Sequence, residues 1–384
     1  MPRASLAKTL YRSLQPAQPQ MLETLCRFVT AESPSLDKIP TDRCGELIAA
    51  EWRKQNLEVQ RVAQKHRGDH LRIATPKQPG AKGQLLILGH YDTVYSTGSL
   101  DKMPFRVQSG KAFGPGSFDM KAGIVQALFA HDALQKLNVL PRKRLVFLWT
   151  SDEEIGSDSS RKLIEAEARR SDAVFVLEPA YGPRGLLKTS RKAVGEAEII
   201  VHGRASHAGL APEEGINAIH ELSRQISRVI KFADPRRGTT VNVDVIEGGT
   251  RANVIAERAR AVVDLRAVGT ADMRQLERRL HALKPVQRGA RLEILGGFSR
   301  PPLERSMSAA LYNAAKSFAA EMHLPLGESA AGGGSDGNFT AALGIPTLDG
   351  LGAVGDGAHS SHEHILAAAM PQRAALLAAL LATT

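Results

Sequence analysis

The apolar run that begins at residue 84 constrains the fold of this chain most. It reads QLLILGHYDTV, so a stretch without polar interruption ends at a glycine and leads directly into His90 and Asp92. Such a run is typical of a strand buried on both faces of a parallel sheet. Open α/β sheets bind their ligands beyond the carboxyl ends of the strands. We therefore expect an α/β fold with a functional site near His90, although His-x-Asp alone is also common in ordinary loops.

Two later apolar runs end in the same way. Residues 144–150 read RLVFLWT and precede the acidic sequence SDEEIG, and residues 173–177 read AVFVL and precede Glu178. An acidic cluster is usually a solvated turn, but these acids follow strands that are too apolar for the surface. If the three strands are parallel, their acids and His90 converge at one edge of the sheet.

A glycine-rich loop, GPGSFDMKAG, precedes a predicted helix that ends near residue 137. Asp119 in this loop has two interpretations. It can be the N-cap of the helix, which requires no ligand. It can also be a carboxylate presented to a site by a loop in which glycine permits close approach. The local sequence leaves both open.

Composition limits the class of protein. A chain of 384 residues exceeds what one core usually fills, so two domains are expected. Cys26 and Cys44 form neither a disulfide framework nor a Cys-x-x-Cys site, which favours a reducing cytoplasm and leaves imidazole and carboxylate as metal ligands. The chain has no long apolar segment, and residues 1–15 lack the apolar core of a secretory signal, so no membrane partner is expected.

The net charge of +10 raises the alternative of a basic scaffold that binds nucleic acid. The basic residues, however, are scattered in twos and threes among acids, and aromatic residues make up only 5%. This pattern favours a solvated surface that steers anionic substrates. We expect no nucleic-acid partner.

Residues 192–300 follow the order β-α-β-β-α-β. The strand-like segments are 196–202, 240–246, 256–268 and 291–295, and the helical segments are 213–232 and 271–283. This is the ferredoxin-like arrangement, compact enough to be an inserted domain. We therefore expect a discontinuous domain formed by residues 1–191 and 301–384. The inserted sheet would leave an edge at which two subunits can pair.

Seven motifs occur in an order that resembles one family. They are HYDTV (90–94), DMKAG (119–123), DEEIG (152–156), LEP (177–179), SHAG (206–209), GGSD (333–336) and HSSHE (359–363). Together they resemble metallopeptidase family 20, the co-catalytic zinc aminoacylases, glutamate carboxypeptidases and acetylornithine deacetylases, and most of all its carboxypeptidase G members. The resemblance implies a zinc-exopeptidase-like catalytic domain with a mixed central sheet. It also implies that the ferredoxin-like α+β insertion acts as a dimerisation and lid domain.

The resemblance implies two Zn²⁺ per subunit, with Co or Mn as alternatives that the same ligand types accept. Asp119 would bridge the two ions. His90 and Glu178 would complete one site, and Glu154 and His359 the other. In this family the peptide bond after the bridging aspartate is often cis, which is here the bond that follows Asp119.

Three residues receive catalytic roles from the same resemblance. Asp92 would orient the ring of His90, because a metal-bound imidazole needs its second nitrogen held. Glu153 would be the general base that activates water and protonates the leaving amine. His207 would reach across a dimer to the carbonyl oxygen of the substrate.

Asn253 and Gly333 are expected to contact the substrate, again by resemblance. Arg300 lies in the sequence FSRPP, which resembles the carboxypeptidase segment whose arginine binds the free α-carboxylate of the substrate. The alternative for Arg300 is a surface arginine at a hinge. Among the histidines near the carboxyl terminus, His359 is chosen as ligand for its spacing to Glu363.

Two other histidines receive no functional role. His364 is expected to be an exposed turn residue, because only one ligand is required from this segment. His70 follows a polar connection and is expected to lie on the surface.

The predicted reaction is metal-dependent hydrolysis of a peptide or amide bond next to a free C-terminal carboxylate, by a glutamate-carboxypeptidase-like exopeptidase or dipeptidase. The substrate would be a small peptide or an N-acyl amino acid. The alternative is an N-acyl-amino-acid deacylase, similar to acetylornithine deacetylase, that uses the same site. We expect a cytoplasmic homodimer that pairs through the inserted domain.

Overall fold

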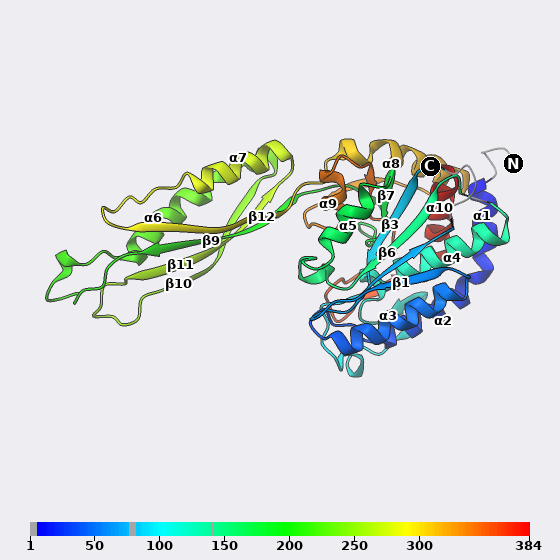
Figure 1. Ribbon diagram of the computed structural model, residues 1–384, viewed down its shortest axis with the longest axis horizontal. Helices are drawn as coiled ribbons and strands as arrows, with labels where there is room; N and C mark the ends of the chain where they lie inside the picture. Colours follow the sequence, from blue (N-terminus) through cyan, green and yellow to red (C-terminus); the bar gives the residue numbers. More distant parts are fainter. Residues whose placement is uncertain (1–5, 77–81, 140) are drawn as a thin grey trace. The chain divides into compact units, whose positions relative to one another are not determined.

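A computed structural model describes residues 6–76, 82–139 and 141–384 (Figure 1). It divides into two compact units. The first contains the chain up to Ser190 together with Arg305–Ala331 and Ser335–Thr384, and the second contains Arg191–Glu304 and Gly332–Gly334. Residues 1–5, 77–81 and 140 of the expected domain 1–191 lie outside the described residues.

The first unit is built on a six-stranded sheet in the order β1-β2-β6-β3-β7-β14. The strands are β1 (Glu58–Val62), β2 (His70–Ala74), β3 (Gln84–His90), β6 (Arg144–Thr150), β7 (Ala173–Val176) and β14 (Thr347–Leu348). Strands β6, β3, β7 and β14 are mutually parallel, whereas β1 and β2 are antiparallel to their neighbours. The sheet is therefore mixed, as the resemblance implies.

Helices cover both faces of this sheet. Those that pack on one face or extend its core are α1 (Leu6–Leu14), α2 (Gln18–Thr30), α3 (Lys38–Arg53), α4 (Ala122–Lys136), α8 (Arg305–Glu321) and α10 (Ala369–Thr383). On the other face lie α5 (Arg161–Ala168) and α9 (Gly337–Ala342). None of the described helices combines the length and the apolar character needed to cross a bilayer.

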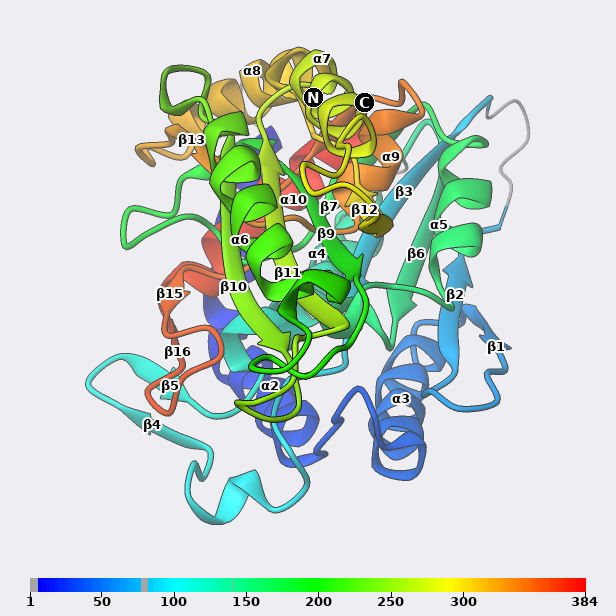
Figure 2. The same cartoon turned by 90° about the vertical axis from the view of Figure 1, so that its left-hand side faces the viewer.

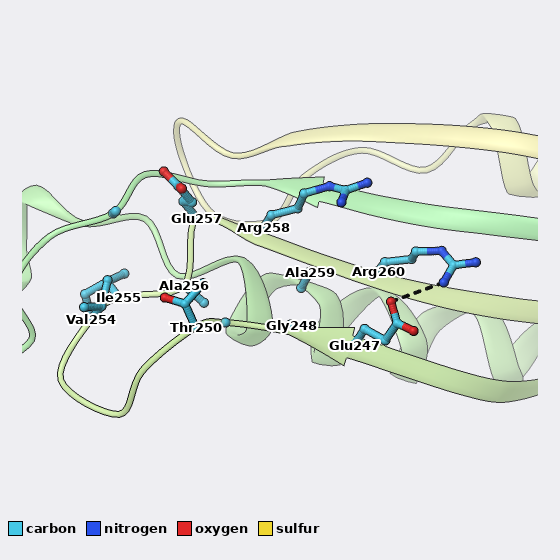
Figure 3. A pocket seen from close by; sticks show the side chains of 12 residues that line it. Glu247, Gly248, Thr250, Val254, Ile255, Ala256, Glu257, Arg258, Ala259 and Arg260 are labelled. Atoms are coloured by element: carbon cyan, nitrogen blue, oxygen red, sulfur yellow. Dashed lines mark hydrogen bonds and ion pairs between the residues drawn. The ribbon is translucent and has the colours of Figure 1, made fainter.

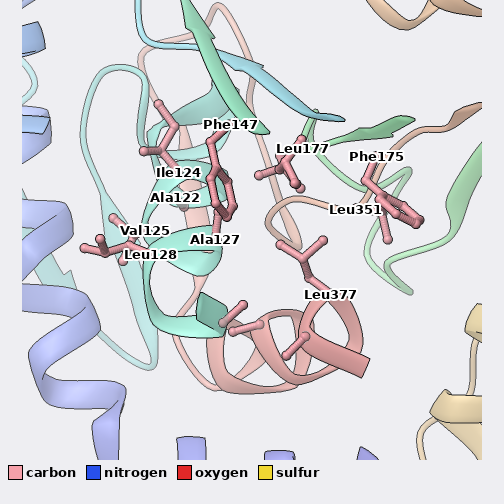
Figure 4. Close-up of a cluster of buried hydrophobic side chains, with 14 of the residues drawn as sticks. Ala122, Ile124, Val125, Ala127, Leu128, Phe147, Phe175, Leu177, Leu351 and Leu377 are labelled. Carbon is pink, nitrogen blue, oxygen red and sulfur yellow. The ribbon is translucent and has the colours of Figure 1, made fainter. Parts of the chain in front are cut away.

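Successive residues of β3 supply both faces of the core. Leu85 and Ile87 belong to the cluster around α4 and α10, and Leu86 and Leu88 belong to the cluster around α5 and α9. Figure 4 shows part of the first cluster, where side chains of α4, β6, β7 and α10 meet. Burial on both faces explains why the strand has no polar residue between Gln84 and His90 at its two ends.

Two smaller sheets complete the first unit. One has the order β15-β16-β5-β4, formed by β15 (Gly355–Asp356), β16 (His364–Leu366), β5 (Lys111–Phe113) and β4 (Arg106–Gln108). The other pairs β8 (Leu187–Arg191) with β13 (Glu328–Ala331). The pairing of β16 with β5 brings the chain after residue 355 next to the glycine-rich loop that carries Asp119.

The second unit has the ferredoxin-like order that the sequence predicts. Its elements are β9 (Ala193–His202), α6 (Ala218–Val229), β10 (Thr240–Gly248), β11 (Arg258–Ala267), α7 (Thr270–His281) and β12 (Arg291–Arg300). The sheet order is β10-β11-β9-β12, and every neighbouring pair is antiparallel. The order of strands and helices along the chain follows from the period-2 alternation of the strands and the single apolar stripe of each helix.

Both helices of this unit lie on one face of its sheet (Figures 1 and 2). Leu222 of α6 and Leu276 of α7 pack there against Ile199 and Val201 of β9. The opposite face carries charged side chains, such as those of Glu198 and Arg260, which form a bidentate ion pair. Strand β10 ends the sheet on one side, so among the described residues no strand pairs with its outer edge.

Candidate metal centre

The carboxyl ends of β3, β6 and β7 lie at one edge of the central sheet. His90 is paired with Thr150 in the parallel register of β3 and β6. On the other side of β3, the N–H of Leu177 donates to the carbonyl of Leu88 at 2.9 Å, which brings Glu178 beside His90. The expectation that three parallel strands deliver their acids to one edge is confirmed.

One cluster forms around the buried ring of His90. Its Nε2 lies 3.3 Å from Oδ1 of Asp119 and 3.4 Å from Oε1 of Glu178. Its Nδ1 lies 3.1 Å from the carbonyl oxygen and 3.4 Å from Oδ1 of Asp92. Within the described residues, neither His90 Nε2 nor Asp119 Oδ1 has a hydrogen-bond partner, although both are buried. A ring held at Nδ1, with Nε2 turned toward carboxylates, has the geometry of a metal ligand.

A second histidine approaches Asp119 from the opposite side. Nε2 of His359 lies 3.0 Å from Oε2 of Glu154 and 3.6 Å from Oδ2 of Asp119. The two oxygens of Asp119 therefore face different histidines, which is the arrangement of a bridging carboxylate. The Asp119–Met120 peptide bond is cis, as the resemblance implies.

Negative charge dominates the electrostatics of this cluster. Burial lowers the pKa of His90, but the nearby carboxylates of Asp119, Asp92 and Glu178 outweigh that effect and raise the pKa well above its usual value. The carboxylate of Glu154 raises the pKa of His359 to about 9. Carboxylates that hold neighbouring imidazoles in this way form a set of donors suited to divalent cations.

Glu153 borders the same cluster. One potential ligand atom from each of His90, Glu153 and Glu178 lies within 4.8 Å of the others, and the same holds for His90, Asp119 and Glu154. The donors thus form two overlapping groups that share His90. Glu153 is close enough to act on a reactant held at the same place.

Asp92 joins the two parts of the site. Its Oδ1 accepts from the backbone N–H of Glu153 and its Oδ2 from that of Glu154, both at 3.3 Å. Ser35 donates to Oδ2 at 2.7 Å and so holds the carboxylate from the other side. Sequence reasoning missed Ser35. Its only local signal was the Ser-Pro-Ser break between two helices, which does not reveal a contact with residue 92.

Glu363 organises the loop that carries Asp119. Its buried carboxylate accepts from the backbone N–H groups of Gly116, Phe118 and Asp119 at 3.0, 2.8 and 3.0 Å. Burial raises the pKa of Glu363 to about 7, and these N–H groups oppose the rise. The sequence paired Glu363 with His359 by spacing, but it did not reveal the contact with this loop.

Two predictions about histidines were wrong. His70 is fully buried in β2, where its ring contacts Ser151 and Ser159. His364 is 8% exposed in β16, with its ring centroid 5.2 Å from that of Phe113. Each histidine is covered by a segment distant in sequence, and neither pairing has a local signal.

Four residues with predicted roles lie in the second unit: His207, Asn253, Arg300 and Gly333. Nδ1 of His207 accepts from the N–H groups of Gly209 and Leu210 at 3.2 and 3.1 Å, so the ring proton resides on Nε2. The carbonyl of Asn253 accepts from the N–H of Ala208 at 2.9 Å, which places the segments of His207 and Asn253 side by side.

A cavity of about 370 Å³ lies along the segment that follows Asn253 (Figure 3). Thr250, Val254 and Arg258 are among the residues that line it. Arg300 ends β12 and is 6% exposed. The alternative prediction, that Arg300 lies on the surface, is therefore wrong. Gly333 is exposed, and its carbonyl accepts from Nη1 of Arg191 at 3.3 Å.

Comparisons with known proteins identify the family of the chain. The family described as peptidase family M20/M25/M40 matches residues 86–383. Carboxypeptidase G2 of Pseudomonas sp. (strain RS-16) is 31% identical over 97% of this chain and 91% of its own length. Succinyl-diaminopimelate desuccinylase of Paraburkholderia xenovorans (strain LB400) is 29% identical over 74% of this chain and 79% of its own length.

A solved structure shows the same fold. It is the structure of a dinuclear metal-binding peptidase of the M20 family from Bacillus subtilis, with a TM-score of 0.68 and 16% sequence identity. The match covers 95% of this chain and 97% of the other.

Proposed function

Because the chain belongs to peptidase family M20/M25/M40, and is therefore a hydrolase, we propose that it cleaves a peptide or amide bond next to a free C-terminal carboxylate. The observation that carries this proposal is Asp119, whose two oxygens face His90 and His359 separately, with Glu153 beside the same cluster. The similarity to carboxypeptidase G2 along almost the whole chain favours a carboxypeptidase over other members of the family.

The donors fit two divalent cations, which we propose are zinc. Asp119 would bridge them, His90 and Glu178 would hold one, and Glu154 and His359 the other. The ligand types, imidazole and carboxylate without thiolate, suit Zn and also accept Co or Mn. When bound, such a pair lowers the pKa of a water and stabilises negative charge on the carbonyl oxygen of the substrate.

Glu153 moves the proton in this scheme. Its carboxylate would accept a proton from the attacking water and return it to the leaving nitrogen. Glu154, its neighbour in the sequence, contacts His359, so we assign Glu154 to hold the site and Glu153 to transfer the proton. General-base catalysis of this kind contributes roughly 10²–10⁴-fold in rate.

Residues of the second unit would bind the substrate. The planar guanidinium of Arg300 matches a carboxylate in a bidentate manner and would select a free C-terminal acid. His207 carries its ring proton on Nε2 and could donate it to the carbonyl oxygen. We propose that Asn253 and Gly333 contribute further contacts and that the second unit serves as lid and dimerisation domain.

A second candidate is an N-acyl-amino-acid deacylase that uses the same centre. The similarity to succinyl-diaminopimelate desuccinylase over three quarters of the chain favours it. One panel of substrates separates the two reactions: glutamate-terminated dipeptides and folates against N-acetyl and N-succinyl amino acids. The proposal predicts the higher kcat/KM for the glutamate-terminated group. A higher kcat/KM for the acyl amino acids would transfer the assignment to the deacylase.

A further inference from the structure

His70 is held by two serines that flank the turn bearing Glu153 and Glu154. Its Nδ1 lies 3.1 Å from Oγ of Ser151, and its Nε2 lies 3.1 Å from Oγ of Ser159. The ring is fully buried at the first residue of β2. A buried imidazole with both nitrogens engaged differs from a core histidine that merely fills space.

The side chain of Asp152 closes the same turn from within. Its Oδ2 accepts from the N–H of Ser159 at 2.7 Å and from that of Ser160 at 3.2 Å. Its backbone carbonyl accepts from the N–H of Ser157 at 2.8 Å. Asp152 thus draws the start and the end of the turn together, and His70 contacts one serine at each end.

Counting hydrogens shows that the ring competes for the serine hydroxyls. The hydroxyl of Ser151 donates to the carbonyl of Gly68, and that of Ser159 donates to Oδ2 of Asp152. Each hydroxyl has one hydrogen, so both serines must accept from the ring while these bonds exist. A neutral imidazole can donate from only one nitrogen. One serine must then donate its hydrogen to the ring, and it loses its hydrogen bond to Gly68 or to Asp152.

The charges around His70 affect the pKa of its ring. Burial lowers the pKa of the ring. The carboxylates that oppose this effect are those of Asp152, Asp92, Asp336 and Asp69. Oδ1 of Asp152 is buried and has no hydrogen-bond partner within the described residues. His70 therefore lies in the field of the same acids that hold the turn.

We propose that His70 is a positioning residue that fixes the Glu153–Glu154 turn against β2 through Ser151 and Ser159. The inference rests on the proposed function, because it assumes that Glu153 transfers the proton and that Glu154 holds a metal. It extends that function to a residue that touches neither the substrate nor the metal ions. Replacing it should disturb one metal position and the proton-transfer step, and leave substrate affinity nearly unchanged.

Three variants of His70 separate its two contacts. In His70→Asn the amide reaches about as far as Nδ1 and can keep the bond to Ser151. In His70→Gln it reaches about as far as Nε2 and can keep the bond to Ser159. His70→Phe keeps neither bond. His66→Asn, in the exposed connection before β2, is the matched control.

The test measures kcat, KM and the titration of Zn²⁺ into metal-free protein. Loss of a contact behind a metal ligand typically costs about 10–100-fold in metal affinity or activity, so His70→Phe should weaken one of the two binding steps and lower kcat by that amount. KM should stay within about threefold. His70→Asn and His70→Gln should lie between wild type and His70→Phe, and the control should match wild type.

Two results would overturn this inference and leave the proposed function standing. In the first, folded His70→Phe keeps the wild-type kcat and both metal-binding steps. In the second, the variants lose thermal stability and nothing else. A wild type that binds no pair of metal ions and cleaves none of the panel substrates would overturn the proposed function, and with it this inference.

Discussion

The carboxylate of Glu363 accepts from the backbone N–H of Asp119 at 3.0 Å, across 244 residues of sequence. Gly116 and Phe118 donate to the same carboxylate, so one buried side chain holds the whole loop. The contact joins the segment that carries His359 to the segment that carries the proposed bridging ligand. It therefore couples the proposed metal site to a residue outside the proposed set of ligands.

Glu363→Gln should weaken this loop. An amide presents one acceptor oxygen and turns an NH₂ group toward N–H donors, so at least one backbone donor loses its partner. An unsatisfied buried group costs about 1–3 kcal/mol, and the variant should lose about that much stability. Zinc affinity should fall by at least about tenfold, as expected for a residue that supports a ligand. Calorimetric unfolding and zinc titration measure both effects, with exposed Glu23→Gln as control. Wild-type zinc affinity in Glu363→Gln would show that the loop does not depend on this carboxylate.

Glu153→Gln tests the assignment of the base. The amide keeps the size of the side chain but cannot accept a proton, so kcat should fall by roughly 10²–10⁴-fold. Metal content should remain that of the wild type, because Glu153 is not one of the proposed ligands. Elemental analysis and steady-state kinetics check the two parts. A variant that retains its kcat would remove Glu153 from the mechanism.

Arg300→Ala tests carboxylate recognition. KM for a free-acid dipeptide should rise by about 10–100-fold, the loss of roughly 1.5–3 kcal/mol from a charged hydrogen bond, whereas KM for the matching amide should change little. Arg300→Lys should restore only part of the preference, because a single ammonium lacks the planar fork. An unchanged ratio of acid to amide activity in Arg300→Ala would exclude this role.

Stability should depend on pH through Glu221 in the second unit. Burial raises the pKa of this fully buried carboxyl, but hydrogen bonds from the N–H of Val286, the amide of Gln225 and the N–H of Gln287 outweigh it, so the pKa is lowered overall. A lowered folded-state pKa contributes stability above the unfolded value, near 4.5, that is lost as pH falls through the folded value.

The matched variant is Glu221→Gln. At pH 7 it should be less stable than wild type by about 1–3 kcal/mol in urea unfolding, since it loses charge-assisted bonds to the backbone. The difference should shrink as pH falls below about 4.5. A difference that is independent of pH would show that the ionised form is not what stabilises this region.

The edge of β10 is the expected place for subunits to pair. Val245 and Ile246 on this strand are 44% and 59% exposed, which is unusual for large apolar side chains on an open edge. We expect wild type to sediment as a dimer and Val245→Lys/Ile246→Lys to sediment as a monomer. If His207 acts across the dimer, the monomeric variant also loses activity. A monomeric wild type in analytical ultracentrifugation would contradict this use of the edge.

How far sequence predicts this protein depends on whether a residue's environment is local. The run of residues 84–90 has to be buried on both faces, so its strand, its parallel neighbours and the position of His90 at the sheet edge could all be predicted. The ferredoxin-like order could be predicted for the same reason, because each element carries its own periodicity.

His70 shows where that reasoning fails. In β2 His70 alternates with apolar Leu71 and Ile73, so it shares its face of the strand with Arg72. The local pattern is a polar residue beside a polar connection, for which solvent is the simplest environment. Only the fold supplies the two serines that cover it. The covering turn, residues 151–159, contacts His70 from 81 and 89 residues away. The contacts of Glu363 and Ser35 could not be predicted for the same reason, because their partners lie in distant segments.

The proposed bridging role of Asp119 is tested most directly by counting metal ions in purified protein. Elemental analysis should find two zinc ions per chain in wild type, and Asp119→Ala, which removes both bridging oxygens, should retain fewer than one. Asp356→Ala, in the neighbouring small sheet, is the control and should retain two. Two tightly bound ions in folded Asp119→Ala, or none in active wild type, would contradict the account.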